Sequence, residues 1–287
     1  MIGDGYGNHG RAKRVIYRYK NYTMQEQLTW RKKINSLHTF DALAAHENYY
    51  YNYGYLYGYK TTETFAGGTE LINFTNITSL DGYQNNYRTE SYLSRLRYNY
   101  DEKYFAEASF RRDGSSRFAP GKRWGNFWSV GGSWVVTEED FLKPYAETIN
   151  NLKFRASYGE VGNDASVDYY GYMALYDLNQ NANITAAYKV QNEALDIQWE
   201  TASSLGVALE GRLFKRANFS LEYFDKRSQD LLFDVQLPLS VGANSTSSAE
   251  ATVTKNLGSV SNRGIEISAD VDVIKSKGLT WNIGANV

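Results

Sequence analysis

Cysteine is absent from the 287 residues, and proline occurs only 3 times. The absence of cysteine rules out disulfide bonds and thiolate metal sites. Scarce proline, together with 24 glycines and an aromatic content of 15%, indicates strands and turns. No run approaches the roughly 18 apolar residues that a membrane-spanning helix needs, and the mean hydropathy is -0.55. The sequence therefore excludes a helical membrane protein. A transmembrane β-barrel stays open, because its strands alternate polar and apolar residues.

Neither sign of charge dominates, since 31 Lys and Arg stand against 32 Asp and Glu. For the chain as a whole, this balance gives no reason to expect nucleic acid or an anionic lipid surface as a partner. The first residues, Met1 to Gly10, lack a basic segment followed by an apolar one, so no signal peptide is visible. We therefore expect either a cytosolic protein or a piece of a longer chain.

Period-two alternation of apolar and polar residues is the strongest signal, and it recurs from about Glu90 to the last residue. Between residues 92 and 111, aromatic and aliphatic side chains fall on one face and Arg, Asn, Glu and Ser on the other, with a turn at Asp101 to Lys103. The pattern returns over residues 128–136, 152–158, 204–223 and 265–286, and a noisier hairpin covers residues 22–48. We predict about ten antiparallel strands joined as consecutive hairpins.

Short and long connections alternate along this series. The short ones are Asn35-Ser36, Asp101 to Lys103, Thr137 to Asn151, Phe214 to Arg216 and Ile274 to Gly278. The long ones are Tyr49 to Thr89, Asp113 to Gly125, Glu160 to Gln198 and Ser228 to Arg263. In an up-and-down meander all long connections lie at one end, which is the habit of outer-membrane barrels. Within one short connection, Thr137 to Asp140 predicts the capped start of a short helix that Pro144 ends.

A soluble β-sandwich or a lipocalin-like barrel is the alternative, because alternation also arises where one face of a sheet meets water. Two observations favour the membrane barrel. Loops of this length are uncommon in compact soluble domains, and aromatic residues gather near strand ends, as interface girdles require.

Motifs for catalysis or cofactor binding are not supported by their context. Gly5-x-Gly7-x-x-Gly10 matches a dinucleotide fingerprint, but no apolar strand precedes it and no helical pattern follows. His9, His38 and His46 lack the spacing of a metal site, and Glu138-Glu139 fits helix capping better than acid-base catalysis. We expect no catalytic residue, no cofactor, no metal site and no enzymatic activity.

Two segments resemble the barrel of SusC/RagA-family TonB-linked outer-membrane transporters. They are FAEASFRRDGSSRF at residues 105–118 and RWGNFWSVGGSW at residues 123–134. Further similar segments follow in the family's order: LKFRASYG at 152–159, Gly162-Asn163, Trp199-Glu200, YFDK at 223–226, DLL at 230–232, NLGSV at 256–260 and NRGIE at 262–266. The resemblance covers roughly residues 20–287 and is weakest from Tyr49 to Thr64.

The resemblance implies a bacterial outer-membrane protein that crosses the membrane many times, with an all-β, antiparallel, up-and-down transmembrane barrel. It implies import of glycans or peptides with a SusD-like surface lipoprotein, the TonB complex and outer-membrane lipid as partners, and no nucleic acid. Residues 1–287 are then expected to be part of one barrel domain, without the plug, its TonB box or a signal peptide. The alternative is a non-transporting barrel or adhesin that binds ligands through its long loops.

One segment is the candidate functional surface loop. It comprises Arg111, Arg112, Asp113, Gly114, Ser115, Ser116, Arg117 and Trp124. We expect the chain to turn through Asp113-Gly114-Ser115-Ser116, with Gly114 at a positive φ. Arg111, Arg112 and Asp113 with Arg117 could bind an anion, but charged loop tips are usually solvated, and we expect solvation here. The loop is expected to shape the outer rim, with direct contact to substrate as the secondary possibility.

Overall fold

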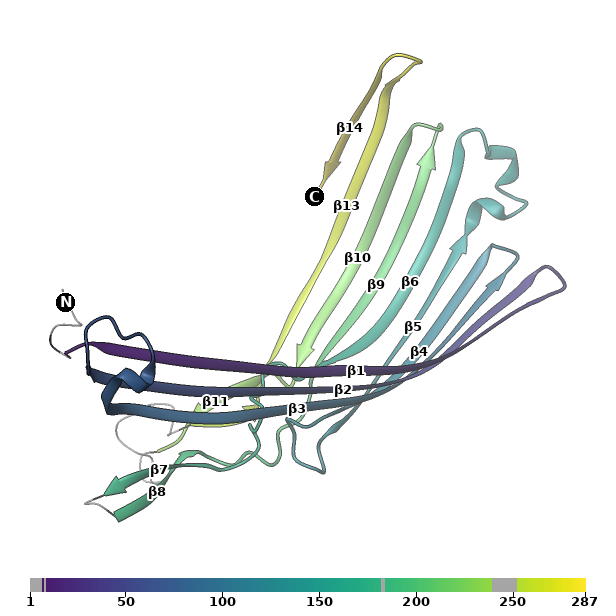
Figure 1. Cartoon of the computed structure of the whole chain (residues 1–287). Helices are drawn as coiled ribbons and strands as arrows, with labels where there is room; N and C mark the ends of the chain where they lie inside the picture. Colours follow the sequence, from purple (N-terminus) through teal and green to yellow (C-terminus); the bar gives the residue numbers. More distant parts are fainter. Residues whose placement is uncertain (1–6, 8, 182–183, 239–251) are drawn as a thin grey trace. The chain divides into compact units, whose positions relative to one another are not determined.

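The computed structural model describes Gly7 and residues 9–181, 184–238 and 252–287. Ten strands form one sheet in which each strand lies beside its neighbours in the sequence, apart from two small hairpins inserted in the connections (Figure 1). The sheet strands are β1 Arg11–Ile34, β2 His38–Glu63, β3 Phe74–Tyr100, β4 Tyr104–Ser115, β5 Trp124–Val135, β6 Ile149–Asn163, β9 Glu200–Leu213, β10 Ala217–Gln229, β13 Ser259–Lys275 and β14 Thr280–Asn286. The predicted antiparallel meander of about ten strands is confirmed.

The chain divides into two compact units. Unit 1 comprises Met1–Met24 and Asn48–Thr89, and unit 2 comprises Gln25–Glu47 and Glu90–Val287. The division cuts the first three strands, so each of them contributes about ten residues to unit 2 and the remainder to unit 1. Unit 2 also contains every sheet strand from β4 onward.

Cross-strand pairing in unit 2 joins like with like. Ala156 of β6 pairs with Val207 of β9, which pairs with Tyr223 of β10, which in turn pairs with Ile265 of β13. Because side chains of a strand alternate between faces, this register gives the sheet one apolar and one polar face. The apolar and polar faces predicted for these strands are the two faces that this register produces.

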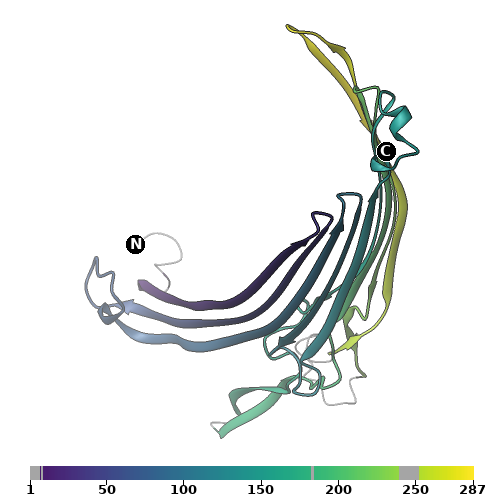
Figure 2. The same ribbon diagram turned by 90° about the vertical axis from the view of Figure 1, so that its right-hand side faces the viewer.

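Tight turns join the strands at one end of unit 2. Asn35, Ser36, Asp101, Glu102, Phe214 and Lys215 all have φ between 50° and 60°. Two successive positive φ values are the geometry of a type I′ hairpin turn, whose twist matches the flanking strands. Backbone hydrogen bonds also link these turns: the amide of Asp101 donates to the carbonyl of Leu37 at 2.7 Å. The turns lie at the upper right ends of the strands in Figure 1 and at the upper ends in Figure 2.

The connection from β5 to β6 differs from the prediction of a capped helix. It holds two 3-10 turns, Val136–Glu138 and Lys143–Tyr145, neither with a side-chain cap. The hydroxyl of Thr137 accepts a hydrogen bond from the amide of Leu152 at 3.4 Å instead. Pro144 lies at the start of the second turn and does not end a helix. The capping prediction was wrong because tertiary partners occupy the polar side chains.

The four predicted long loops contain more strand than their composition indicated. Most of Tyr49 to Thr89 belongs to β2 and β3, which leaves residues 64–73 as the connection, with one 3-10 turn at Leu71–Asn73. The Glu160 to Gln198 connection holds a hairpin of β7 Leu175–Asn181 and β8 Ile184–Gln191. The Ser228 to Arg263 connection holds β11 Leu232–Gln236 and β12 Thr252–Asn256. Residues 182–183 and 239–251 of these connections lie outside the described residues, as does Gly5.

Among the described residues, no helix has both the length and the apolar character needed to cross a membrane.

Candidate functional site: a polar sheet face and a packed loop end

The polar face of unit 2 carries charges that neutralise one another. Arg155 of β6 donates from Nε to Glu210 of β9 at 2.7 Å and from Nη2 to Glu222 of β10 at 2.6 Å. The three side chains are about one-third exposed. Since Ala208 lies directly between Arg155 and Glu222 in the register, its small side chain leaves room for the guanidinium to reach across. Arg155 thus links a glutamate on β9 with a glutamate on β10.

Further ion pairs continue along this face. Arg97 of β3 pairs with Glu107 of β4, and Arg31 of β1 approaches Asp41 of β2 at 3.3 Å. A hollow of about 480 Å³ lies over this part of unit 2, with Arg97, Glu107 and Arg155 in its lining. Apolar side chains such as Phe105 and Ala156 also line it, so the hollow offers a solute both charged and apolar surface.

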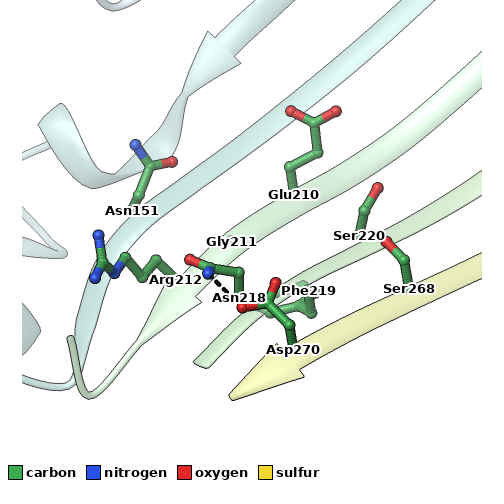
Figure 3. Close-up of a pocket in the computed structure, with 9 residues that line it drawn as sticks. All are labelled: Asn151, Glu210, Gly211, Arg212, Asn218, Phe219, Ser220, Ser268 and Asp270. Carbon is green, nitrogen blue, oxygen red and sulfur yellow. Dashed lines mark hydrogen bonds between the residues drawn. The ribbon is translucent and has the colours of Figure 1, made fainter. Parts of the chain in front are cut away.

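A second hollow of about 390 Å³ lies on the polar face near the tight turns (Figure 3). The amide of Asn218 donates to the carboxylate of Asp270 at 2.9 Å, and Asn282 of β14 donates to the same carboxylate at 3.2 Å. Arg212 and Glu210 also line this hollow. These residues are held by partners on neighbouring strands, so the geometry favours a polar lining over a specific catalytic or binding centre.

The opposite face of unit 2 is apolar and exposed. Phe110 of β4 pairs with Trp128 of β5, and these side chains are 46% and 42% exposed. The indole of Trp128 in turn packs on Tyr158 of β6 at a centroid separation of 5.2 Å. A sheet face that exposes many apolar side chains is typical of a surface in contact with lipid.

The candidate loop begins later than predicted. Asp113 and Gly114 are paired in the sheet with Gly125 and Trp124, so the turn covers residues 116–123. Gly114 does not have a positive φ. The indole of Trp124 occupies the space next to the Cα of Gly114, and a Cβ added there would lie 3.0 Å from the ring. The turn prediction for Gly114 was wrong, because a close aromatic neighbour, and not backbone conformation, requires glycine there.

The charged residues of this segment are held by neighbours. Nε of Arg111 donates to both carboxylate oxygens of Asp113 at 2.7 Å. The guanidinium of Arg112 lies 5.0 Å from the ring centre of Trp124. Arg117 donates to the carbonyl of Asp164 at 2.7 Å and lies over the ring of Tyr169. The prediction of solvated charges is therefore wrong for Arg117, which is partly buried, whereas Arg111, Arg112 and Trp124 are exposed.

Serine 115 is buried and joins this loop to the next. Its hydroxyl donates to Asp164 in the β6–β9 connection at 2.6 Å and accepts from the amide of Arg117 at 3.2 Å. Ser116, its neighbour, is partly buried. Asp164 was not singled out by the sequence, because an Asp in a long polar segment carries no local signal of its distant partner.

A small hydrophobic core ties the long connections of unit 2 together. Phe118 is fully buried and packs with residues of the β6–β9 connection, and Trp199, Leu232 and Val253 pack against them. The indole Nε1 of Trp199 donates to the carbonyl of Arg123 at 2.9 Å. The other members of this core, here named the loop core, are Ala119, Val167, Tyr172, Ala194 and Ile197.

Glu200, the first residue of β9, links the connections that form the loop core. It is 8% exposed. Its carboxylate accepts hydrogen bonds from Asn163 at 2.7 Å, from Ser166 at 3.0 Å and from the backbone amide of Leu232 at 2.9 Å. Three donors on one buried carboxylate describe a structural joint between connections. The sequence offered Trp199-Glu200 as a recognisable pair without revealing this role.

Unit 1 carries a wall of stacked tyrosines. Tyr17 and Tyr19 of β1 lie beside Tyr53 of β2, and Tyr53 and Tyr55 lie beside Tyr83 of β3, with ring centres 5.1–6.2 Å apart. These residues have odd numbers on their strands, so they share one face. In unit 2 the odd-numbered residues of the same strands, such as Arg31 and Asp41, belong to the polar face.

The comparisons with known proteins agree with this two-faced sheet. The family model described as "TonB dependent receptor-like, beta-barrel" matches residues 3–287. The chain belongs to this family. TonB-dependent receptors of this kind are outer-membrane transporters, which confirms the predicted family and fold class.

The sequence relatives of this receptor barrel are much longer than the chain. "TonB-dependent receptor P39" of Formosa agariphila is 30% identical over 289 residues, which is 99% of this chain and 27% of the relative. "TonB-dependent receptor SusC" of Bacteroides thetaiotaomicron is 28% identical over 240 residues, 80% of this chain and 23% of the relative. The chain thus spans about a quarter of the relatives it matches.

Solved structures support the same fold. The RagAB peptide importer in its closed-closed state has a TM-score of 0.85 at 22% identity, over 96% of this chain and 30% of that chain. The outer-membrane transporter YddB from Escherichia coli has a TM-score of 0.58 at 13% identity, over 90% of this chain and 31% of that chain. At these identities the likeness concerns the fold of the receptor barrel alone.

Proposed function

We propose that the chain forms part of the wall of an outer-membrane importer, with its polar face toward the lumen and its apolar face toward lipid. The observation that carries this proposal is the uniform division of unit 2 into an ion-paired face and an exposed aromatic face. Residues that alternate in this way along successive strands satisfy both solvents at once. The role is transport and not catalysis; the names of the relatives, which are receptors, support this.

The cargo is proposed to be a glycan or a peptide, delivered with a SusD-like surface lipoprotein and driven by the TonB complex. Support comes from the relative SusC and from the fold shared with RagAB, a peptide transporter by its printed description. The hollows on the lumen face offer paired charges and amides together with apolar contacts, a mixture that fits a cargo with both polar and apolar surface, such as a glycan or a peptide. The loop around Arg112 and Trp124 is proposed to shape the rim, with cargo contact as a secondary role.

Uptake of a labelled cargo by cells with and without TonB tests this proposal. Import should depend on both TonB and the receptor, and deletion of a neighbouring gene for a SusD-like lipoprotein should lower it. Surface binding that persists without TonB and is never followed by uptake would contradict transport and favour an adhesin.

A further inference from the structure

The stacked tyrosines of unit 1 follow β2 for most of its length in this unit. Tyrosine occupies every odd-numbered position of the strand from Tyr49 to Tyr59. Because residues two apart on a strand point to the same side of the sheet, these side chains share one face. Tyr17 and Tyr19 of β1 and Tyr83 of β3 join them through the ring contacts described above. We name this three-strand surface the tyrosine wall.

Three rings of the wall form a row across the strands. Tyr55 on the central strand β2 has Tyr17 of β1 on one side, with ring centres 5.7 Å apart, and Tyr83 of β3 on the other, at 5.1 Å. The two outer rings are open to solvent, since Tyr17 is 56% exposed and Tyr83 is 49% exposed. A ligand can therefore reach a row of aromatic side chains that spans three strands.

The face that carries the wall is balanced in charge. In the strand segments of unit 1, the charged residues at odd-numbered positions are two of each sign: Arg11, Lys13, Glu63 and Asp81. Lys13 lies over the ring of Tyr57 at 5.2 Å. Glu47, the next odd-numbered acid along β2, accepts a hydrogen bond from Gln25. Since neither sign of charge is in excess, the wall suits a neutral ligand better than an anion or a cation.

Each ring of the wall combines carbon surface with a hydroxyl that both donates and accepts hydrogen bonds. Asn21 of β1 and Asn85 of β3 add amides at odd-numbered positions, where the aliphatic residues of these segments are Val15 and Ile77. A surface so rich in hydroxyls is poorly suited to lipid chains, which offer no hydrogen-bonding partner. It matches a ligand that is neutral, polyhydroxylated and partly apolar. A pyranose sugar has this combination, because its CH groups form apolar faces and its hydroxyls surround the edge.

We propose that the tyrosine wall binds a neutral glycan, with the CH faces of its sugars against the tyrosine rings and its hydroxyls bonded to the phenols, Asn21 and Asn85. The inference rests on the import function proposed above and deepens it, because it selects a glycan over a peptide. An extended peptide is bound mainly through its backbone at a free strand edge or through its charged ends. The backbone of β2 is already paired with β1 and β3, and the charges of the wall are balanced.

Binding of neutral oligosaccharides to the purified receptor tests this proposal. Titration calorimetry compares cellohexaose, maltohexaose and mannohexaose, which differ in linkage or in the sugar, with acidic hexagalacturonate and with a neutral Gly-Ser peptide. We expect at least one neutral hexasaccharide to bind more tightly than the acidic sugar and the peptide. The double variant Tyr55→Ala with Tyr83→Ala should raise its Kd about ten-fold, because each aromatic contact contributes about two- to ten-fold in affinity.

Matched variants on the two faces of β1 decide whether the wall is responsible. Tyr19 is 64% exposed on the wall, and Tyr22 is 54% exposed on the opposite face. Tyr19→Ala should weaken binding, whereas Tyr22→Ala should leave the Kd unchanged. Tyr83→Phe keeps the ring and should bind more tightly than Tyr83→Ala; equal affinities would contradict contact through the rings. Resistance to heat on a denaturing gel verifies that each variant is folded.

The remaining outcomes also give a clear answer. The proposal is overturned if no neutral hexasaccharide binds, if hexagalacturonate or the peptide binds as tightly, or if Tyr22→Ala weakens binding as much as Tyr19→Ala. If the wall variants keep their glycan affinity but lose a co-purifying protein, the wall serves a protein partner and the glycan proposal fails. Because binding is measured on the purified receptor without TonB, its failure leaves TonB-dependent uptake untouched. A receptor that binds the glycan but never imports it would refute transport and leave the tyrosine wall standing.

Discussion

The indole of Trp124 lies directly over Gly114, its cross-strand partner, so that a Cβ at position 114 would come within 3.0 Å of the ring. Gly114 and Trp124 are the last residue pair between β4 and β5, next to the loop that contributes to the loop core. Gly114 is buried because the ring covers it, and Arg112 lies against the same ring at 5.0 Å.

Replacement of Gly114 by valine should therefore destabilise the folded protein. A branched side chain must displace the indole, and overpacking of this kind costs about 1–3 kcal/mol. The yield of heat-resistant folded protein measures the effect, with Gly121→Val as the matched control, since nothing lies within 4 Å of a Cβ there. A Gly114→Val protein that folds normally but loses uptake would favour a loop that touches cargo.

Removal of the Ser115 hydroxyl should loosen the join between two connections. Ser115→Ala removes the 2.6 Å hydrogen bond to the carboxylate of Asp164, and the loss of a hydrogen bond to a charged group costs about 1.5–3 kcal/mol. Limited proteolysis of the folded protein should then cut the β6–β9 connection faster. The control is Ser109→Ala. The Ser109 hydroxyl forms a 2.6 Å hydrogen bond with Ser129 within the sheet, so its loss does not affect a connection. Equal cutting rates in both variants would contradict the assigned role of Ser115.

Successive side chains of β9 should face lipid and water in alternation. Spin labels at Leu205, Val207 and Leu209 should respond to a lipid-soluble relaxation agent, because their partners on β6 and β10 are mainly apolar. Labels at Ser204 and Gly206 should respond to a water-soluble agent instead. Similar responses from both sets would show that the assignment of faces is wrong.

The turn end of unit 2 should loosen in acid. Lys215 donates to Glu147 at 2.8 Å, and this hydrogen bond holds the pKa of Glu147 below its ordinary value of 4.5. A carboxylate with a lowered pKa stabilises the fold above the ordinary value, and the contribution is lost as the pH falls through the lowered pKa. The protection of the Phe214–Arg216 turn against hydrogen exchange, taken relative to the intrinsic exchange rate at each pH, should fall over that range. Glu147→Gln should remove this pH-dependent step in protection; a step that persists would place its origin elsewhere.

Topology gives a prediction on whole cells. An epitope inserted after Gly121, in the β4–β5 loop, should be reachable by antibody from outside, whereas one at Lys215 should be reached only after the membrane is opened. The reverse pattern would invert the orientation proposed for the sheet.

Strand order and turn positions could be predicted from sequence because both follow from local rules. Alternation over two residues marks each strand, and pairs such as Asn35-Ser36 tolerate the positive φ that a tight hairpin turn needs. The stretch from Tyr49 to Thr64 was assigned to a loop on its Tyr, Asn and Gly content. Its tyrosines nevertheless recur at every second position, and the partners on β1 and β3 that make it a strand are distant in sequence.

The loop end could not be predicted because its interactions join residues far apart in the chain. Arg117 looks like a solvated charge beside Ser115 and Ser116, yet its partner is the backbone of Asp164 in another connection. Because of this contact, Arg117→Ala should weaken the join between the two connections, whereas loss of a solvated arginine would have little effect. Nothing local to Gly114 announces the ring that covers it either.

The loop core also bears on how such receptors can be re-engineered. Phe118 from one connection packs with Ile197 from the next, and Leu232 and Val253 from a third lie against them. A graft of a single loop from a relative would bring in side chains shaped for absent neighbours. Exchanges of specificity between such proteins should therefore succeed when the three connections are transplanted as one set, and recombination breakpoints are best placed in the strands.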